Sequence, residues 1–160
     1  MVCFVNWNYK LRHQSFFSTN GKYKYQTLNY KGNLNMNEDI VIKFWGFMSD
    51  AMFDGVGELI EKDANVWLPN TREVFRGRDK YIIFNKKYPG RWIITLDKIF
   101  SKDDMVISAV KVESEDKAIN FYATSFFTIK NNLIHEITEY WGENNEPPIW
   151  RIEESLSERY

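Results

Sequence analysis

Four consecutive β-rich segments in the second half of the chain constrain its fold most strongly. Residues 91–100, 105–113, 118–129 and 133–141 are rich in β-branched and aromatic side chains. The connections between them, at residues 102–104, 114–116 and 130–132, are short and polar. Short polar connections between strands are typical of hairpins. The sequence therefore predicts an antiparallel meander of four strands, in which each strand pairs with the next.

Helical periodicity precedes these strands. We predict a first helix that starts after Asn37 as its cap and ends near residues 53–55, because apolar side chains recur three or four residues apart: Ile40, Val41, Phe44, Trp45, Met48, Ala51 and Met52. A short helix around 56–60, a strand over 63–69 and a third helix from a turn at 75–79 to about Tyr88 follow, and Pro89-Gly90 breaks that helix. This order indicates an α+β fold, with a curved antiparallel sheet wrapped around three N-terminal helices and a cone-shaped interior.

The composition excludes several functional classes. The chain has 160 residues, so we expect one domain. A formal net charge of −1 disfavours nucleic-acid binding, which needs a basic surface. No apolar run approaches the length of a membrane span. The apolar stretch at the N-terminus is too short for a secretory signal. Cys3 is the single cysteine, which excludes an internal disulfide and favours a cytoplasmic location. We expect no metal and no cofactor.

The first 35 residues differ in charge from the rest of the chain. They contain five basic and no acidic residues. We interpret residues 1–35 as an extension, residues 36–152 as the domain and residues 153–160 as a polar tail. The extension is explained by a translation start assigned upstream of a true start at Met36, by a disordered or strand-like arm, or by a basic tail for nucleic acid.

Several motifs in this order resemble the nuclear transport factor 2-like superfamily, and within it the SnoaL-like domains. The motifs are Phe75–Asp79 before the third helix, Phe121–Phe127, Ile134–Trp141 and the closing Pro147–Arg151. The resemblance covers about residues 38–151. It implies a cystatin-like cone and a homodimer formed through the outer face of the sheet. Because this fold carries enzymes, ligand-binding proteins and interaction modules, the resemblance does not determine a reaction.

The resemblance also allows a test for known chemistry. Ketosteroid isomerase-like proteins use a carboxylate base before a proline, and that position here is Leu68. Their two oxyanion donors fall at Phe44 and roughly at Ser125. Leucine cannot take a proton from a carbon acid, so we do not expect that mechanism. The residue sets of scytalone dehydratase-like and limonene epoxide hydrolase-like members cannot be assembled from the sequence either.

The last β-rich segment supplies the best candidate for chemistry. Strict alternation puts Leu133, His135, Ile137, Glu139 and Trp141 on one face. By the resemblance, this face turns into the cone, where desolvation would raise the pKa of Glu139 and suit it to acid/base work. The alternative is an ion pair with Arg151 or Arg78 that ties the tail to the sheet. His135 is expected near the rim of the cone.

We predict a ligand pocket from these faces, lined by Phe44, Trp45, Leu68, Trp92, Ser125, Ile137, Glu139 and Trp141. Ser125 would donate to a ligand oxygen, or else be satisfied by the backbone. Trp67 lies on the opposite face to Leu68 and is expected at an interface or the surface. Three functions remain open: a binding protein for a small, mostly apolar ligand; an isomerase, cyclase or hydrolase with Glu139 as acid/base; and a non-catalytic dimerisation module.

Overall fold

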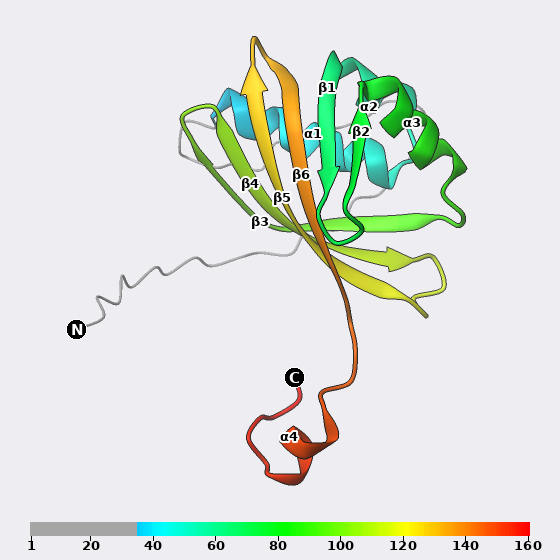
Figure 1. Cartoon of the computed structure of the whole chain (residues 1–160), viewed down its shortest axis with the longest axis vertical. Coiled ribbons are helices and arrows are strands. Elements are labelled where there is room, and N and C mark those ends of the chain that lie inside the picture. Colours follow the sequence, from blue (N-terminus) through cyan, green and yellow to red (C-terminus); the bar gives the residue numbers. More distant parts are fainter. Residues whose placement is uncertain (1–34) are drawn as a thin grey trace, which may run out of the picture. The chain divides into compact units, whose positions relative to one another are not determined.

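A computed structural model of the chain describes residues 35–160, and its core is a curved six-stranded sheet with the first three helices on one side (Figure 1). The predictions for residues 1–34 lie outside the described part. Within that part, none of the helices combines the length and the apolar character needed to cross a membrane. The elements in chain order are α1 Met36–Ser49, α2 Phe53–Glu58, β1 Ile60–Leu68, β2 Glu73–Arg76, α3 Arg78–Lys87, β3 Trp92–Lys102, β4 Met105–Ser114, β5 Asn120–Lys130, β6 Leu133–Glu143 and α4 Ile149–Glu153.

The sheet has the strand order β2-β1-β6-β5-β4-β3. The predicted meander is confirmed, since β3, β4, β5 and β6 pair antiparallel in succession. The pairing of β1 with β6 is parallel, with Trp67 opposite Thr138, so the sheet is mixed. Strand β2 was predicted as part of a turn, and that prediction is wrong. Only four residues long, β2 is too short to show a β pattern, and its pairing with β1 defines it as a strand.

The predicted boundaries of the first helix need correction. Helix α1 is capped by Asn35, whose side chain accepts a hydrogen bond from the backbone N–H of Asn37 at 3.2 Å. Asn37 instead donates its side-chain amide to the carbonyl of Asp103 at 3.1 Å. The helix ends at Ser49, and residues 53–55 already begin α2. Ala51 has φ 56°, in the left-handed region, which stops a helix even though the apolar pattern continues past it.

A bulge changes which residues of β6 face the core. The pairing with β5 shifts register between Thr128 and Ile129, and the pairing with β1 shifts between Ile60 and Asn65. As a result Ile134 is fully buried, whereas the side chain of His135 is 42% exposed. The prediction that His135 shares a face with Glu139 is therefore wrong. Beyond the bulge the alternation holds, because Ile137 and Glu139 are both buried.

The core lies between this face of the sheet and the helices. Phe44 and Trp45 of α1 meet Phe127 of β5 edge to face, with ring centroids 5.2 and 6.0 Å apart respectively. All three rings are almost completely buried. Trp67, on the other face of β1, is 36% exposed, as predicted. The helices therefore fix one face of the sheet as the interior, and the candidate site lies on that face.

Candidate functional site

Three polar side chains form a row across the interior face of the sheet. Ser108 of β4 is paired in register with Ser125 of β5, and Ser125 with Glu139 of β6. Directly opposed residues on adjacent strands have their Cβ atoms about 5 Å apart. Among the described residues, these three are the buried polar ones. A row of buried polar groups in an otherwise apolar core is costly unless each has a partner.

Both ends of the row have partners from the helices. The indole Nε1 of Trp45 in α1 donates to the Ser108 hydroxyl at 2.9 Å. At the other end, the Tyr81 hydroxyl in α3 donates to Oε1 of Glu139 at 3.1 Å. The indole Nε1 of Trp141, two residues further along β6, donates to Oε2 at 3.3 Å. Glu139 is thus held between a helix and its own strand.

The centre of the row has no partner. Ser125 is completely buried, and its hydroxyl oxygen makes no hydrogen bond. Leaving a buried hydroxyl unsatisfied costs about 1–3 kcal/mol. The alternative in which the backbone satisfies Ser125 is therefore wrong. The Ser125 hydroxyl is paired in register with the carboxyl group of Glu139 on the neighbouring strand. The Ser125–Glu139 pair is therefore the candidate site on this face.

Burial controls the ionisation of Glu139. It raises the pKa of Glu139 to about 7, although the hydrogen bonds from Tyr81 and Trp141 act in the opposite direction. The same burial, with the nearby Glu139 carboxylate, raises the pKa of Tyr81 well above its ordinary value. Tyr81 therefore stays a hydrogen-bond donor, while Glu139 exchanges its proton near neutral pH. This is the range in which a carboxyl group works as both acid and base.

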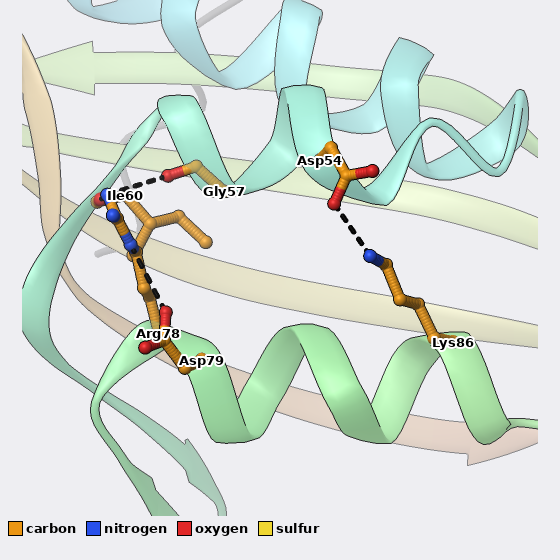
Figure 2. A network of polar contacts seen from close by, with 6 residues as sticks. All are labelled: Asp54, Gly57, Ile60, Arg78, Asp79 and Lys86. Carbon is orange, nitrogen blue, oxygen red and sulfur yellow. Dashed lines mark hydrogen bonds and ion pairs between the residues drawn. The ribbon is translucent and has the colours of Figure 1, made fainter.

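No cation compensates Glu139 within the described residues, so the predicted ion pair is wrong. Arg78 instead donates Nη1 to the carbonyls of Gly57 and Ile60, at 3.2 and 3.1 Å, and pairs with Asp79 (Figure 2). Arg151 lies over the ring of its neighbour Trp150. Arg78 thus joins the start of α3 to α2 and β1, where it has a structural role.

Lys86 makes a second link between α2 and α3. Its ammonium group lies 2.6 Å from the carboxylate of Asp54 (Figure 2). The pair is largely exposed, so it adds little stability by itself. Together with Arg78 it defines how α3 sits beside α2, and therefore where Tyr81 projects from α3 toward Glu139.

An asparagine holds the other donor of Glu139. The side-chain amide of Asn70 donates to the carbonyl of Trp141, and the backbone N–H of Trp141 donates to the Asn70 side-chain oxygen, both at 3.0 Å. One side-chain amide thus takes the place of a peptide group on a neighbouring strand. Asn70 directly follows the strand predicted over 63–69, and no local signal in the sequence indicates a partner 71 residues away.

Aromatic rings form a continuous arc beside the row. We define the aromatic arc as Phe75, Phe84, Tyr88, Trp92 and Phe121, with successive ring centroids 4.8, 5.5, 6.1 and 5.6 Å apart. All five side chains are at least partly exposed. Phe75 also contacts Tyr81, with 5.8 Å between centroids, so the arc reaches the residue that donates to Glu139. Only Trp92 of this arc was predicted as a site residue.

The predicted pocket residues fall into two groups. The first group is buried in the core and consists of three apolar side chains, Phe44, Trp45 and Ile137, and two members of the polar row, Ser125 and Glu139. Leu68, Trp92 and Trp141 are partly exposed and pack against that core. Trp92 donates its indole N–H to the carbonyl of Pro89 at 3.0 Å. The structure therefore separates a closed interior from an accessible aromatic surface, a division that alternation along single strands does not reveal.

His135 has a different partner. Its Nδ1 lies 2.7 Å from Oε2 of Glu61 on the neighbouring strand β1. The partly exposed position agrees with the predicted place at a rim. No group of three or more metal-ligating side chains comes together anywhere in residues 35–160.

Comparison with known proteins gives a consistent answer at the level of fold. No family model matches the chain, and no curated protein matches its sequence. Among solved structures, a ketosteroid isomerase candidate from Kribbella flavida superposes with a TM-score of 0.69 at 26% identity, over 78% of this chain and 90% of that one. A nuclear transport factor 2-like protein of unknown function from Burkholderia xenovorans gives 0.66 at 17% identity, over 78% and 95%. A SnoaL-like polyketide cyclase candidate from Shewanella putrefaciens gives 0.61 at 10% identity, over 70% and 83%.

Proposed function

We propose that this chain, which belongs to the nuclear transport factor 2-like superfamily, binds a small, mostly apolar ligand between the aromatic arc and the Ser125–Glu139 pair. The observation that carries the proposal is the Ser125 hydroxyl, which is buried, faces the interior and has no hydrogen-bond partner. A ligand with one polar atom would satisfy it and contact Glu139. Aromatic surface with a few polar groups is the usual lining of a small-molecule site.

A ligand would reach this pair by displacing Trp141. Glu139 is only 2% exposed, because Tyr81 and Trp141 cover it. Trp141 is partly exposed and makes the longer of the two bonds, at 3.3 Å, whereas Tyr81 is completely buried at 3.1 Å. Rotation of the indole would release Oε2 of Glu139, and a hydroxyl group of the ligand would take over the bond.

A second candidate function is acid/base catalysis by Glu139, as an isomerase, cyclase or hydrolase. The pKa of about 7 favours it, because the carboxyl group then changes protonation without large cost near neutral pH. In an isomerase or cyclase, the carboxylate would take a proton from a carbon next to a ligand carbonyl. The Ser125 hydroxyl, paired in register with Glu139, would donate to the carbonyl oxygen as negative charge develops there.

A thermal-shift screen tests both functions. The full chain would be exposed to steroids, polyketide-like aromatics, terpenoids and small acids, and each hit repeated on Ser125→Ala and Glu139→Gln. Ligand binding predicts a stabilising hit that Ser125→Ala weakens. Catalysis predicts, in addition, turnover that is lost in Glu139→Gln while the ligand still binds. Hits that neither substitution affects would refute the site, and a broad panel without hits would favour the dimerisation module.

We also propose a cytoplasmic homodimer that associates through the outer face of the sheet. Phe126 and Tyr140 contact each other on that face, with 6.0 Å between ring centroids, and both are exposed by a third or more. Exposed aromatic side chains that cluster on one face are typical of association surfaces. Sedimentation equilibrium of the Tyr140→Arg chain would test this, since the wild-type dimer should dissociate in the variant.

A further inference from the structure

The C-terminal tail, residues 144–160, carries apolar side chains that the rest of the described chain does not cover. Ile149 and Trp150 in α4 are 72% and 53% exposed, and Leu156 is 62% exposed. Helix α4 has five residues and none of them is buried. A helix this short is not stable alone in water, because nucleation costs more than its few hydrogen bonds return. The exposed apolar side chains of the tail are therefore candidates for contact with another surface.

An open groove lies at the β1–β2 hairpin. It has a volume of about 370 Å³ and is lined by Trp67, Leu68, Pro69, Arg72, Glu73 and Val74. Four of these six residues are apolar. This volume is enough for one bulky aromatic side chain, since pockets for small ligands begin at about 300 Å³. We call this feature the hairpin groove.

Several charged residues of the groove and of the tail are complementary and make no ion pair. Arg72 and Glu73 are exposed, and neither side chain makes a hydrogen bond or an ion pair with the described residues. In the tail, the side chains of Glu153 and Glu154 are also exposed and make no hydrogen bond or ion pair with the described residues. Arg151 contacts only the Trp150 ring. The lining thus presents one free side chain of each sign, and the tail presents Arg151 close to Glu153 and Glu154 in sequence. Opposite charges that flank apolar surfaces favour association and fix its register.

We propose that the C-terminal tail of one copy of this chain docks in the hairpin groove of a second copy. The Trp150 indole fills the groove, Arg72 pairs with the acidic residues at 153–154, and Glu73 pairs with Arg151. A second copy is the occupant because, within one chain, the tail leaves its apolar side chains exposed. The exchange is reciprocal, so two identical contacts form around a two-fold axis. This contact needs no ligand and is independent of Glu139.

Peptide binding measures the contact directly. The probe is a fluorescent peptide of residues 144–160, and the receptor is the full chain with Trp150→Ala, whose own tail lacks the anchor. We expect saturable binding that Arg72→Glu weakens by about fivefold or more, the scale of one lost ion pair replaced by a repulsion. Lys130→Glu, an equal charge change at the exposed end of β5, is the control and should bind normally. A peptide with Glu153→Arg and Glu154→Arg should bind the Arg72→Glu receptor better than the original peptide does.

Arg72 offers a variant in which folding and docking change in opposite directions. Its φ of 61° lies in the left-handed region, where glycine is favoured. Arg72→Gly should therefore raise the melting temperature of the chain while it weakens peptide binding. An Arg72→Gly chain that folds normally and binds the peptide as tightly as before would count against the proposal.

Cross-linking identifies the copy that supplies the tail. Val74→Cys and Ile149→Cys are made separately in chains with Cys3→Ser, then mixed and oxidised. A mixed disulfide dimer supports docking between copies. A double variant that forms only an intramolecular disulfide shows that the tail docks on its own chain, which overturns the proposal, as does a peptide that does not bind. If the peptide does not bind but the chain still responds to a ligand through Ser125, this inference fails while the proposed function stands.

Discussion

The two ends of the polar row have the same construction and different chemistry. At one end an indole from α1 donates to the Ser108 hydroxyl, and at the other a phenol from α3 donates to the Glu139 carboxyl. The first contact joins two neutral groups, so its strength does not depend on pH. The second contact holds the carboxyl group of Glu139, and burial raises the pKa of this group to about 7. A helix can therefore be joined to this sheet without an acid, so the packing of α3 does not by itself require the carboxyl group of Glu139.

The largest expected difference between the two ends is in the pH dependence of stability. The folded chain binds the Glu139 proton up to about pH 7, whereas the unfolded chain releases it near 4.5. Native protein thus holds more protons in this interval, and the free energy of unfolding falls as pH rises through it, by about 3 kcal/mol. Urea unfolding of wild type and Glu139→Gln at several pH values checks this. A constant difference between the two would contradict it.

Tyr81→Phe should have the next largest effect. It removes the hydroxyl that donates to Glu139 and leaves the ring contacts in place. Above pH 7 we expect a loss of about 2 kcal/mol in the free energy of unfolding, because a hydrogen bond to a charged group is lost. Below pH 5 the loss should be about half as large. The Glu139 side-chain carboxyl, followed by carbon-13 NMR, should also titrate at higher pH than in wild type.

Ser108→Ala is the matched change at the neutral end. It leaves the buried indole N–H of Trp45 without an acceptor, which should cost about 1–2 kcal/mol. Since neither group ionises, the loss should be the same at pH 5 and pH 8. Thermal unfolding at both values provides the measurement, and a loss that varies with pH would show that the two ends are coupled through Ser125.

Ser125→Ala should have the smallest effect on stability and the clearest effect on binding. Removal of an unsatisfied buried hydroxyl leaves the free energy of unfolding unchanged or raises it by about 1 kcal/mol. A loss of more than 1 kcal/mol would instead reveal that the hydroxyl has a structural partner. If the variant is stable and no longer binds a ligand that stabilises wild type, Ser125 has a role in recognition.

Regular patterns in the sequence predicted much of this architecture. The meander followed from β-rich segments with polar turns, and the burial of Ser125, Ile137 and Glu139 followed from alternation. Alternation failed at His135, because a bulge inserts a residue without any local signal. The partners of Glu139 could not be predicted, since Tyr81 is separated from it by 58 positions and only the folded helix brings them together.

Strands β1 and β6, the first and last in chain order, are neighbours in the sheet. This arrangement determines when the site can form during synthesis. Residue 67 pairs with residue 138, and Asn70 reaches Trp141. Such distant partners must wait for the intervening chain, so their pairing is slow compared with helix formation. On a ribosome, β1 would emerge paired only with β2 and would lack its other neighbouring strand until β6 appeared. A nascent chain stalled before residue 141 should therefore have helices and hairpins but no enclosed carboxyl group, and protease sensitivity in β1 should disappear only when β6 has been released.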